Sequence, residues 1–142
     1  MNESGLAEEL LSSARTIAVV GYTGKPFRPV TTVSEYLRAQ GYRIVPVNPQ
    51  LRGAEVQGEK SYDRVADIPK DVTVDLVDVF RRGEFLDDVV DDAIAAGVPA
   101  IWFQLDLQNV AAAERAERAG MKVVWDRCTQ VEHRRMVRGR AG

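Results

Sequence analysis

A cluster of residues suited to anion binding follows the first long apolar run of the chain. The run, residues 17–20, ends at Gly21, and Thr23, Lys25 and Arg28 come next. A glycine lets the backbone approach a ligand closely, and the start of a following helix offers free N–H groups to a phosphate. The same pattern is also typical of a plain strand-to-helix turn. We therefore expect either a phosphate site or a simple turn.

A second polar group ends the next apolar run, where Asn48 and Pro49 are followed by Arg52. The Asn48 side chain can hydrogen-bond to a ribose or a base, and Arg52 can meet a phosphate. The alternative is an Asx-type turn at Asn48 with a solvated arginine, because asparagine and proline both favour turns. The residues alone leave both interpretations open.

Neither group matches a common nucleotide fingerprint. The G-x-G-x-x-G motif is absent, since Gly21 and Gly24 give only G-x-x-G, and no G-K-[ST] of a P-loop follows. The acidic residue that holds a ribose hydroxyl at the end of the second strand is also missing, because Asn48-Pro49 stands there. These departures disfavour a nicotinamide dinucleotide.

The elements that must position these groups alternate between apolar runs of strand length and stretches of helical period. Strands without apolar–polar alternation are buried on both faces, which is typical of parallel βαβ units. We expect an α/β, Rossmann-like, doubly wound parallel sheet of about five strands with helices on both faces. The expected strands are residues 17–20, 43–47, 72–80, 100–103 and 121–125, and the expected helices include residues 6–11, 33–37, 85–96 and 107–119.

Ligands of such sheets bind beyond the carboxyl ends of the strands, at the point where the strand order reverses. The segments to examine are therefore residues 21–29, 48–53, 80–83, 104–107 and 126–128. Pro46 cannot donate to a strand ladder, so we expect it near a strand end or at a bulge.

Length and composition favour an ordinary soluble domain. The 142 residues suit one domain, with an N-terminal helix to about residue 12 and a basic tail from about residue 129. The tail is a possible helix, but we favour a solvated, partly disordered segment. The net charge of -2 argues against a nucleic-acid or membrane-surface binder. The single cysteine, the acidic N-terminus without a basic leader and the lack of a long apolar run indicate a cytoplasmic protein.

Six short motifs together resemble a known family. The chain is similar to small bacterial coenzyme A (CoA)-binding proteins, the free-standing equivalent of the CoA-binding domain in the succinyl-CoA synthetase α subunit, from about Leu10 to about Arg135. The motifs are Val19-Val20-Gly21, Pro46-Val47-Asn48-Pro49, Gly58-Glu59-Lys60, Asp78-Val79-Phe80-Arg81, Trp102-Phe103-Gln104 and Asp126-Arg127-Cys128.

The resemblance implies a CoA site assembled from strand-end residues. Gly21, Thr23 and Arg28 would lie near the phosphates, and Asn48, Pro49 and Arg52 near the adenosine. Val79, Phe80 and Arg81 would form the floor beside the adenine or the pantetheine. The full expected set is Gly21, Tyr22, Thr23, Lys25, Arg28, Val47, Asn48, Pro49, Arg52, Val79, Phe80, Arg81 and Gln104. Thr23 replaces the family's usual serine, and Val30-Thr31-Thr32 departs from the usual helix start.

The sequence gives no catalytic residue that we would assign. Cys128 could exchange with the CoA thiol, with Arg127 lowering its pKa, but a free cysteine is more often a buried filler. We expect His133, the only histidine, to be a surface or capping residue rather than a base for Cys128. The acidic run, Glu84, Asp87, Asp88, Asp91 and Asp92, is expected to be a solvated helix face and not a metal site.

The leading hypothesis is therefore a non-catalytic module, sensor or carrier that binds CoA or acyl-CoA. One alternative is a thiol- or acyl-transfer enzyme that uses Cys128. A second alternative, a nicotinamide-dependent oxidoreductase, is disfavoured by the missing fingerprint.

Overall fold

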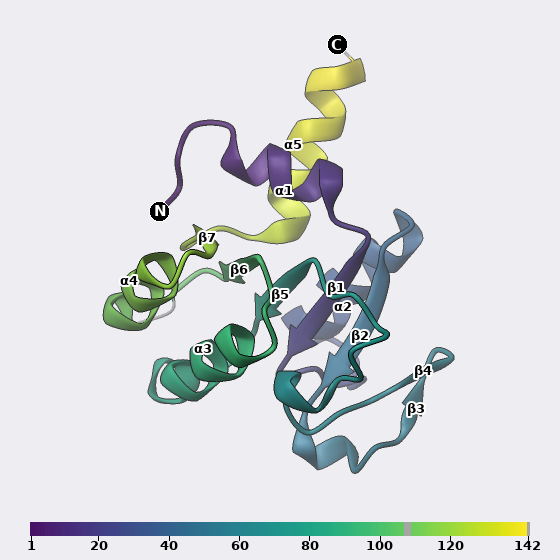
Figure 1. The fold of residues 1–142 in the computed structure, drawn as a ribbon. Helices are drawn as coiled ribbons and strands as arrows, with labels where there is room; N and C mark the ends of the chain where they lie inside the picture. Colours follow the sequence, from purple (N-terminus) through teal and green to yellow (C-terminus); the bar gives the residue numbers. More distant parts are fainter. Residues whose placement is uncertain (107–108, 142) are drawn as a thin grey trace.

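The computed structural model describes residues 1–106 and 109–141, and its centre is a five-stranded parallel sheet (Figure 1). The strands lie in the order β2-β1-β5-β6-β7, and every neighbouring pair is parallel. Their bounds are β1 Thr16–Val20, β2 Arg43–Val47, β5 Leu76–Val79, β6 Ala100–Phe103 and β7 Lys122–Val124. The predicted α/β, doubly wound sheet is confirmed, and its strand order reverses between β1 and β5.

The strands are buried on both faces because their apolar residues alternate between two cores. Ala18 and Val20 of β1 join one core together with Phe103 of β6. Ile17 and Val19 of β1 join the other core. Continuous apolar runs are therefore required in the central strands, as parallel sheets demand.

Helices cover both faces of the sheet. The first core packs against α3, Leu86–Ala95, and α4, Val110–Arg118. The second packs against α1, Leu6–Ser13, α2, Pro29–Ala39, and α5, Thr129–Ala141. In Figure 1, α3 and α4 lie side by side, and the purple α1 crosses the yellow α5.

Short elements complete the edge beside β2. They are the 3-10 turns η1, Pro49–Leu51, and η2, Val65–Asp67, and the hairpin of β3, Glu55–Val56, with β4, Glu59–Lys60; η3, Gly83–Phe85, leads into α3. Pro46 is the next-to-last residue of β2, near the strand end as predicted, and its carbonyl accepts from the Tyr62 N–H at 3.1 Å on the outer side. Its missing N–H faces that edge and removes no bond from the β1 ladder, as expected for an edge strand.

Two elements differ from the sequence-based expectations. Strand β5 begins at Leu76 and not at Val72. The Val72 N–H donates to the Pro69 carbonyl and so closes a turn. The Asp75 side chain accepts hydrogen bonds from the N–H groups of Arg15 and Thr16, at 2.9 and 3.0 Å. The basic tail is a helix, α5, so the helical alternative is confirmed and the favoured partly disordered segment was wrong. Leu107, the expected start of the fourth helix, lies outside the described residues, and α4 begins after Asn109, which caps the Ala112 N–H.

The burial of α5 explains why the tail is ordered. Met136 packs into the second core, and His133 is only 5% exposed. The His133 ring lies edge-on to Tyr36 and Tyr42, and its Nδ1 lies 2.8 Å from the Tyr36 hydroxyl. The expectation of a surface or capping histidine was therefore wrong, and burial lowers the pKa of His133.

Candidate functional site

The edge of the sheet at the reversal between β1 and β5 carries three adjoining cavities. Gly21 follows β1 and Phe80 follows β5, so the chain leaves the carboxyl ends of these two neighbouring strands at this point. Crevices of this kind are where ligands of open α/β sheets bind. We name the three after one residue in each: the Lys25 cavity, the Phe85 cavity and the Cys128 cavity.

The Lys25 cavity, of about 350 Å³, is the electropositive part of the edge. Thr23, Lys25 and Arg28 line it, and the ion pairs within the described chain leave both cations unused. Over the same residues, the N–H groups at positions 22, 23 and 24 donate to no backbone carbonyl. Free amides beside two cations are the chemistry that receives a phosphate.

The backbone of this loop is fixed by its surroundings. The buried Thr31 hydroxyl bridges the Thr23 and Lys25 carbonyls, and the Thr23 hydroxyl accepts from the Lys25 N–H at 3.2 Å. Gly21 has a φ of +86°, and a Cβ there would lie 2.7 Å from the Phe80 carbonyl oxygen. Glycine is thus required both for the left-handed backbone and for the close approach of β5.

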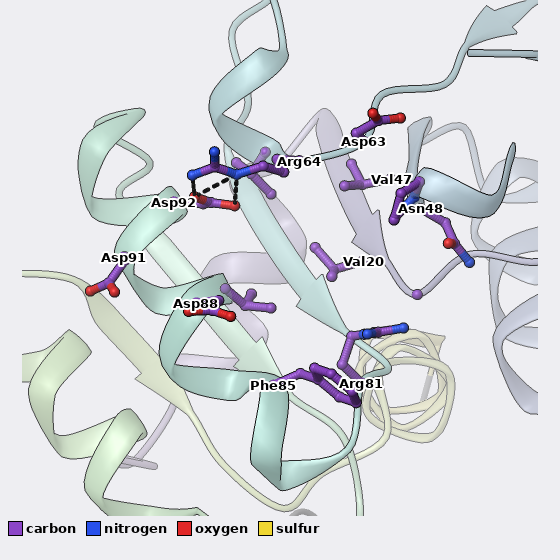
Figure 2. A pocket seen from close by; sticks show the side chains of 14 residues that line it. Val20, Val47, Asn48, Asp63, Arg64, Arg81, Phe85, Asp88, Asp91 and Asp92 are labelled. Carbon is purple, nitrogen blue, oxygen red and sulfur yellow. Dashed lines mark hydrogen bonds and ion pairs between the residues drawn. The ribbon is translucent and has the colours of Figure 1, made fainter. Parts of the chain in front are cut away.

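The Phe85 cavity, of about 470 Å³, has apolar walls and an acidic rim. Its walls include Val47, Pro49, Val65, Phe85 and Val89, and its rim includes Asp63, Asp88 and Asp91. Figure 2 labels Val47, Phe85 and the three rim carboxylates among the side chains that line the cavity, and it shows the Arg64 guanidinium paired to Asp92. The Arg81 guanidinium lies 4.1 Å from the centre of the Phe85 ring. A flat, apolar group with polar N–H edges suits this setting.

The Cys128 cavity, of about 820 Å³, is the largest of the three. Pro29, Val33 and Leu105 supply apolar wall, and the partly buried Cys128 lies where β7 leads into α5. Gln104, 8% exposed, is its most buried polar residue.

The three cavities adjoin, because residues are shared between their walls. Gly21 and Asn48 line both the Phe85 and Lys25 cavities. Pro29 and Phe80 line both the Lys25 and Cys128 cavities. Arg81 lines both the Phe85 and Cys128 cavities.

The structure brings most of the expected residues to this edge. Gly21, Thr23, Lys25, Arg28, Val47, Asn48, Pro49, Phe80, Arg81 and Gln104 each line at least one of the three cavities. Asn48 also forms the local turn weighed above, because its Nδ2 donates to the Tyr22 carbonyl and its Oδ1 accepts from the Gln50 N–H, both at 2.9 Å.

Three expected residues line none of these cavities. Tyr22 is 3% exposed, and its ring packs against the Arg38 guanidinium. Val79 is fully buried in the first core, so it lies beneath the floor of the cleft and not on it. Arg52 is exposed directly after η1 and has a left-handed backbone conformation.

Sequence reasoning missed the wall supplied by α3 and the segment before it. Asp88 and Asp91 line the Phe85 cavity, and Asp92 is 8% exposed and bonded to the Arg64 Nε at 3.1 Å. The expected solvated helix face was therefore wrong for Asp92. The spacing Phe85, Asp88, Val89, Asp92 was a usable signal, because i, i+3, i+4, i+7 places residues on one helical face.

Cys128 and His133, the candidate nucleophile and base for a thiol reaction, are not brought together. Cys128 lines the cleft, but His133 lines none of the three cavities and its Nδ1 meets the Tyr36 hydroxyl. Within residues 1–106 and 109–141, no group of three His, Cys, Asp or Glu side chains could hold a metal ion. In the same residues, no helix has the length and apolarity that crossing a bilayer requires.

Comparison with known proteins identifies the family. A family model described as "CoA binding domain" matches residues 15–134. The Bacillus subtilis protein YneT is 35% identical over 126 residues, which cover 89% of this chain and 90% of YneT. The solved structure of cell-free ID.343 from Thermus thermophilus is 39% identical with a TM-score of 0.87, covering 96% of this chain and 99% of that one.

A more distant likeness is to one part of a larger enzyme. The dinucleotide-forming acetyl-coenzyme A synthetase 1 of Ca. Korarchaeum cryptofilum is 26% identical with a TM-score of 0.62, over 76% of this chain but only 25% of that one. The strand-end cleft, the family match and the full-length relatives lead to one conclusion: this chain belongs to the CoA-binding domain family.

Proposed function

We propose that the protein binds CoA or an acyl-CoA in one extended site that crosses the three cavities. The observation that carries the proposal is the sharing of walls among the cavities, which joins an electropositive pocket to an apolar slot on one side and to a thiol-bearing cavity on the other. CoA has the same order of parts: a planar base, phosphates, and a long arm that ends in a thiol.

Charge decides which part occupies which cavity. The diphosphate occupies the Lys25 cavity, where Lys25 and Arg28 have no ion-pair partner among the described residues and the N–H groups at positions 22–24 donate to no backbone carbonyl. The carboxylates of Asp63 and Asp88 disfavour it in the Phe85 cavity, where Arg81 offsets only part of their charge. The adenine occupies that slot, because its ring fits between apolar walls and its amino group donates to an acidic rim.

The pantetheine arm then occupies the Cys128 cavity. Phe80 forms the wall between this cavity and the phosphates, and Val33 and Leu105 give the arm apolar contacts. Its thiol, or the acyl group attached to it, ends near Cys128. We propose a binding module, acting as a carrier or sensor in the cytoplasm, since a free thiol at the end of the cleft suits a reducing compartment.

A second candidate function is thiol transfer at Cys128. The observation that favours it is that Cys128 lines the cavity assigned to the CoA thiol. A thiolate there could attack a disulfide of CoA, forming a protein–CoA disulfide and releasing the other thiolate. The buried His133 is not placed to assist as a base, so transfer would depend on the thiolate alone.

Thermal denaturation with added ligands tests the proposal. CoA or acetyl-CoA at about 100 times its Kd should stabilise the fold by about 2.7 kcal/mol, because ligand binds only the native state. NAD should not, because Asn48 stands where an acidic residue would hold the ribose and both ends of its amide are bonded within the protein. Equal shifts with both ligands, or a shift with NAD alone, would contradict the proposal.

A further inference from the structure

A buried carboxylate lies beneath the Cys128 cavity, and the binding scheme above does not use it. Asp78 is fully buried in β5, with Val19 and Trp102 beside it in the neighbouring strands. A charge in such a place is costly unless its oxygens accept hydrogen bonds. One Asp78 oxygen accepts from Gln104 Nε2, and the other accepts from the Thr129 hydroxyl at 3.0 Å.

This network fixes the orientation of the Gln104 amide. A carboxylate can only accept, so Gln104 must turn its NH2 group inward. The same Nε2 lies 3.2 Å from the Thr129 hydroxyl oxygen, which has already used its proton on Asp78 and must accept. Both N–H bonds of Gln104 are thereby directed away from the cavity, and its carbonyl oxygen Oε1 is the polar atom left to face a ligand.

The wall around Gln104 indicates what that oxygen would receive. Gln104 lines the Cys128 cavity together with the apolar Val33 and Leu105. An N–H group brought between such walls needs an acceptor, because an unsatisfied buried donor loses its bonds to water. Donation by Gln104 to a carboxylate also increases the negative charge on Oε1, which strengthens it as an acceptor.

We propose that Asp78 is a positioning residue that holds Gln104 so that Oε1 accepts one amide N–H of the pantetheine arm. The inference rests on the proposed binding of CoA. It makes Gln104 select for an arm that carries a donor at this depth, so an arm with an ester oxygen in place of that N–H is rejected. The Asp78 carboxylate sets the direction of the amide without touching the ligand.

Paired ligands and variants separate this role from a merely structural one. The ligands are CoA, two analogues in which either pantetheine amide N–H is replaced by an ester oxygen, and adenosine 3′,5′-bisphosphate, which lacks the arm. Gln104→Met removes the acceptor at similar size, and Gln40→Met, at the exposed end of α2, is the matched control. Affinities are measured by calorimetry at pH 8.

We expect one of the two ester analogues to bind the wild-type protein about 5- to 50-fold more weakly than CoA. Gln104→Met should bind CoA more weakly by a similar factor and no longer distinguish CoA from that analogue. The nucleotide alone should bind Gln104→Met and wild type equally. Gln40→Met should behave as wild type throughout.

The pH dependence of the discrimination between CoA and the sensitive ester analogue, measured below pH 8, tests the part played by Asp78. Burial raises the pKa of Asp78 to about 7, and the groups that lower it are the hydrogen bonds of Gln104 and Thr129, with no charged side chain among them. A proton on Asp78 gives the carboxyl group a donor as well as an acceptor, so Gln104 is no longer restricted to turning its NH2 group inward. Discrimination between CoA and the sensitive analogue should therefore decline from pH 8 to pH 5 in wild type and stay constant in Asp78→Asn.

Each contrary result has a distinct meaning. If wild type binds CoA but tolerates both ester analogues, or if Gln104→Met weakens the nucleotide as much as CoA, the inference is wrong while the proposed function stands. If discrimination is independent of pH in wild type, Asp78 does not orient the amide. If wild type binds neither CoA nor the nucleotide, the proposed function itself fails.

Discussion

Replacement of Gly21 by alanine should destabilise the protein through two separable effects. The left-handed backbone at φ +86° costs an L-residue about 1–2 kcal/mol. The new Cβ would also lie 2.7 Å from the Phe80 carbonyl oxygen and 3.2 Å from Arg81 Cδ. Moving β5 away from β1 to relieve this contact should cost a further 1–3 kcal/mol, roughly the range for overpacking.

Two other glycines provide matched controls. Gly24 has neither a left-handed φ nor any atom within 4 Å of an added Cβ. Gly97 has a φ of +71° but the same open space. Urea denaturation should therefore rank the alanine variants in order: Gly24→Ala within about 0.5 kcal/mol of wild type, Gly97→Ala lower by about 1–2 kcal/mol, and Gly21→Ala lower by about 2–5 kcal/mol. If Gly21→Ala is no less stable than Gly97→Ala, the close approach of β5 to Gly21 is refuted.

The remaining predictions concern two residues that line the cleft, Arg28 and Cys128, and the buried Asp78 beneath it. Arg28→Ala should weaken the binding of CoA by about 1–3 kcal/mol, measured by calorimetry, because a charge-assisted hydrogen bond to a phosphate is lost. Unchanged affinity would place Arg28 outside the site. The effect of the same variant on the binding of dephospho-CoA shows which phosphate Arg28 contacts. Cys128→Ser should change CoA affinity by less than about 1 kcal/mol, since the phosphates and base carry most polar contacts, and a larger loss would contradict this division. Asp78 has a folded pKa of about 7 against an ordinary 3.8, so the folded state holds its proton more tightly and loses stability as pH rises between those values. Asp78→Asn should gain stability relative to wild type from pH 5 to pH 8, by about 3 kcal/mol in urea denaturation, since about 1.4 kcal/mol is gained per pH unit up to the folded pKa; parallel profiles would show that the raised pKa is wrong.

The sheet could be predicted from sequence because its signals are local. Residues 17–20 form a continuous apolar run that ends at a glycine. Such a run is typical of a strand that is buried on both faces. The order of the strands is not local, and so the residue that crowds Gly21 could not be named. Phe80 follows a strand that begins more than fifty residues later in the chain, and it is placed there by pairing between β1 and β5.

The errors have the same origin. The tail was expected to be solvated because of its many arginines, whereas Thr129 and His133 within it are buried. Each is hydrogen-bonded to a residue distant in sequence, Thr129 to Asp78 and His133 to Tyr36. A polar residue that is satisfied by a remote partner cannot be told from a surface residue by composition. Asp78 itself was visible as a lone carboxylate within the apolar run of β5, but its partners were not.

Hydrogen–deuterium exchange with and without CoA tests the central claim most directly, because it locates the ligand. CoA should slow exchange of the free amides at residues 22–24, of the segment around Arg81 and Phe85, and of the residues around Asn48 that line two cavities. Exchange in the β3–β4 hairpin, which lines none of these cavities, should not change. Protection confined to other segments, or no protection at saturating CoA, would contradict a CoA site at the junction of β1 and β5.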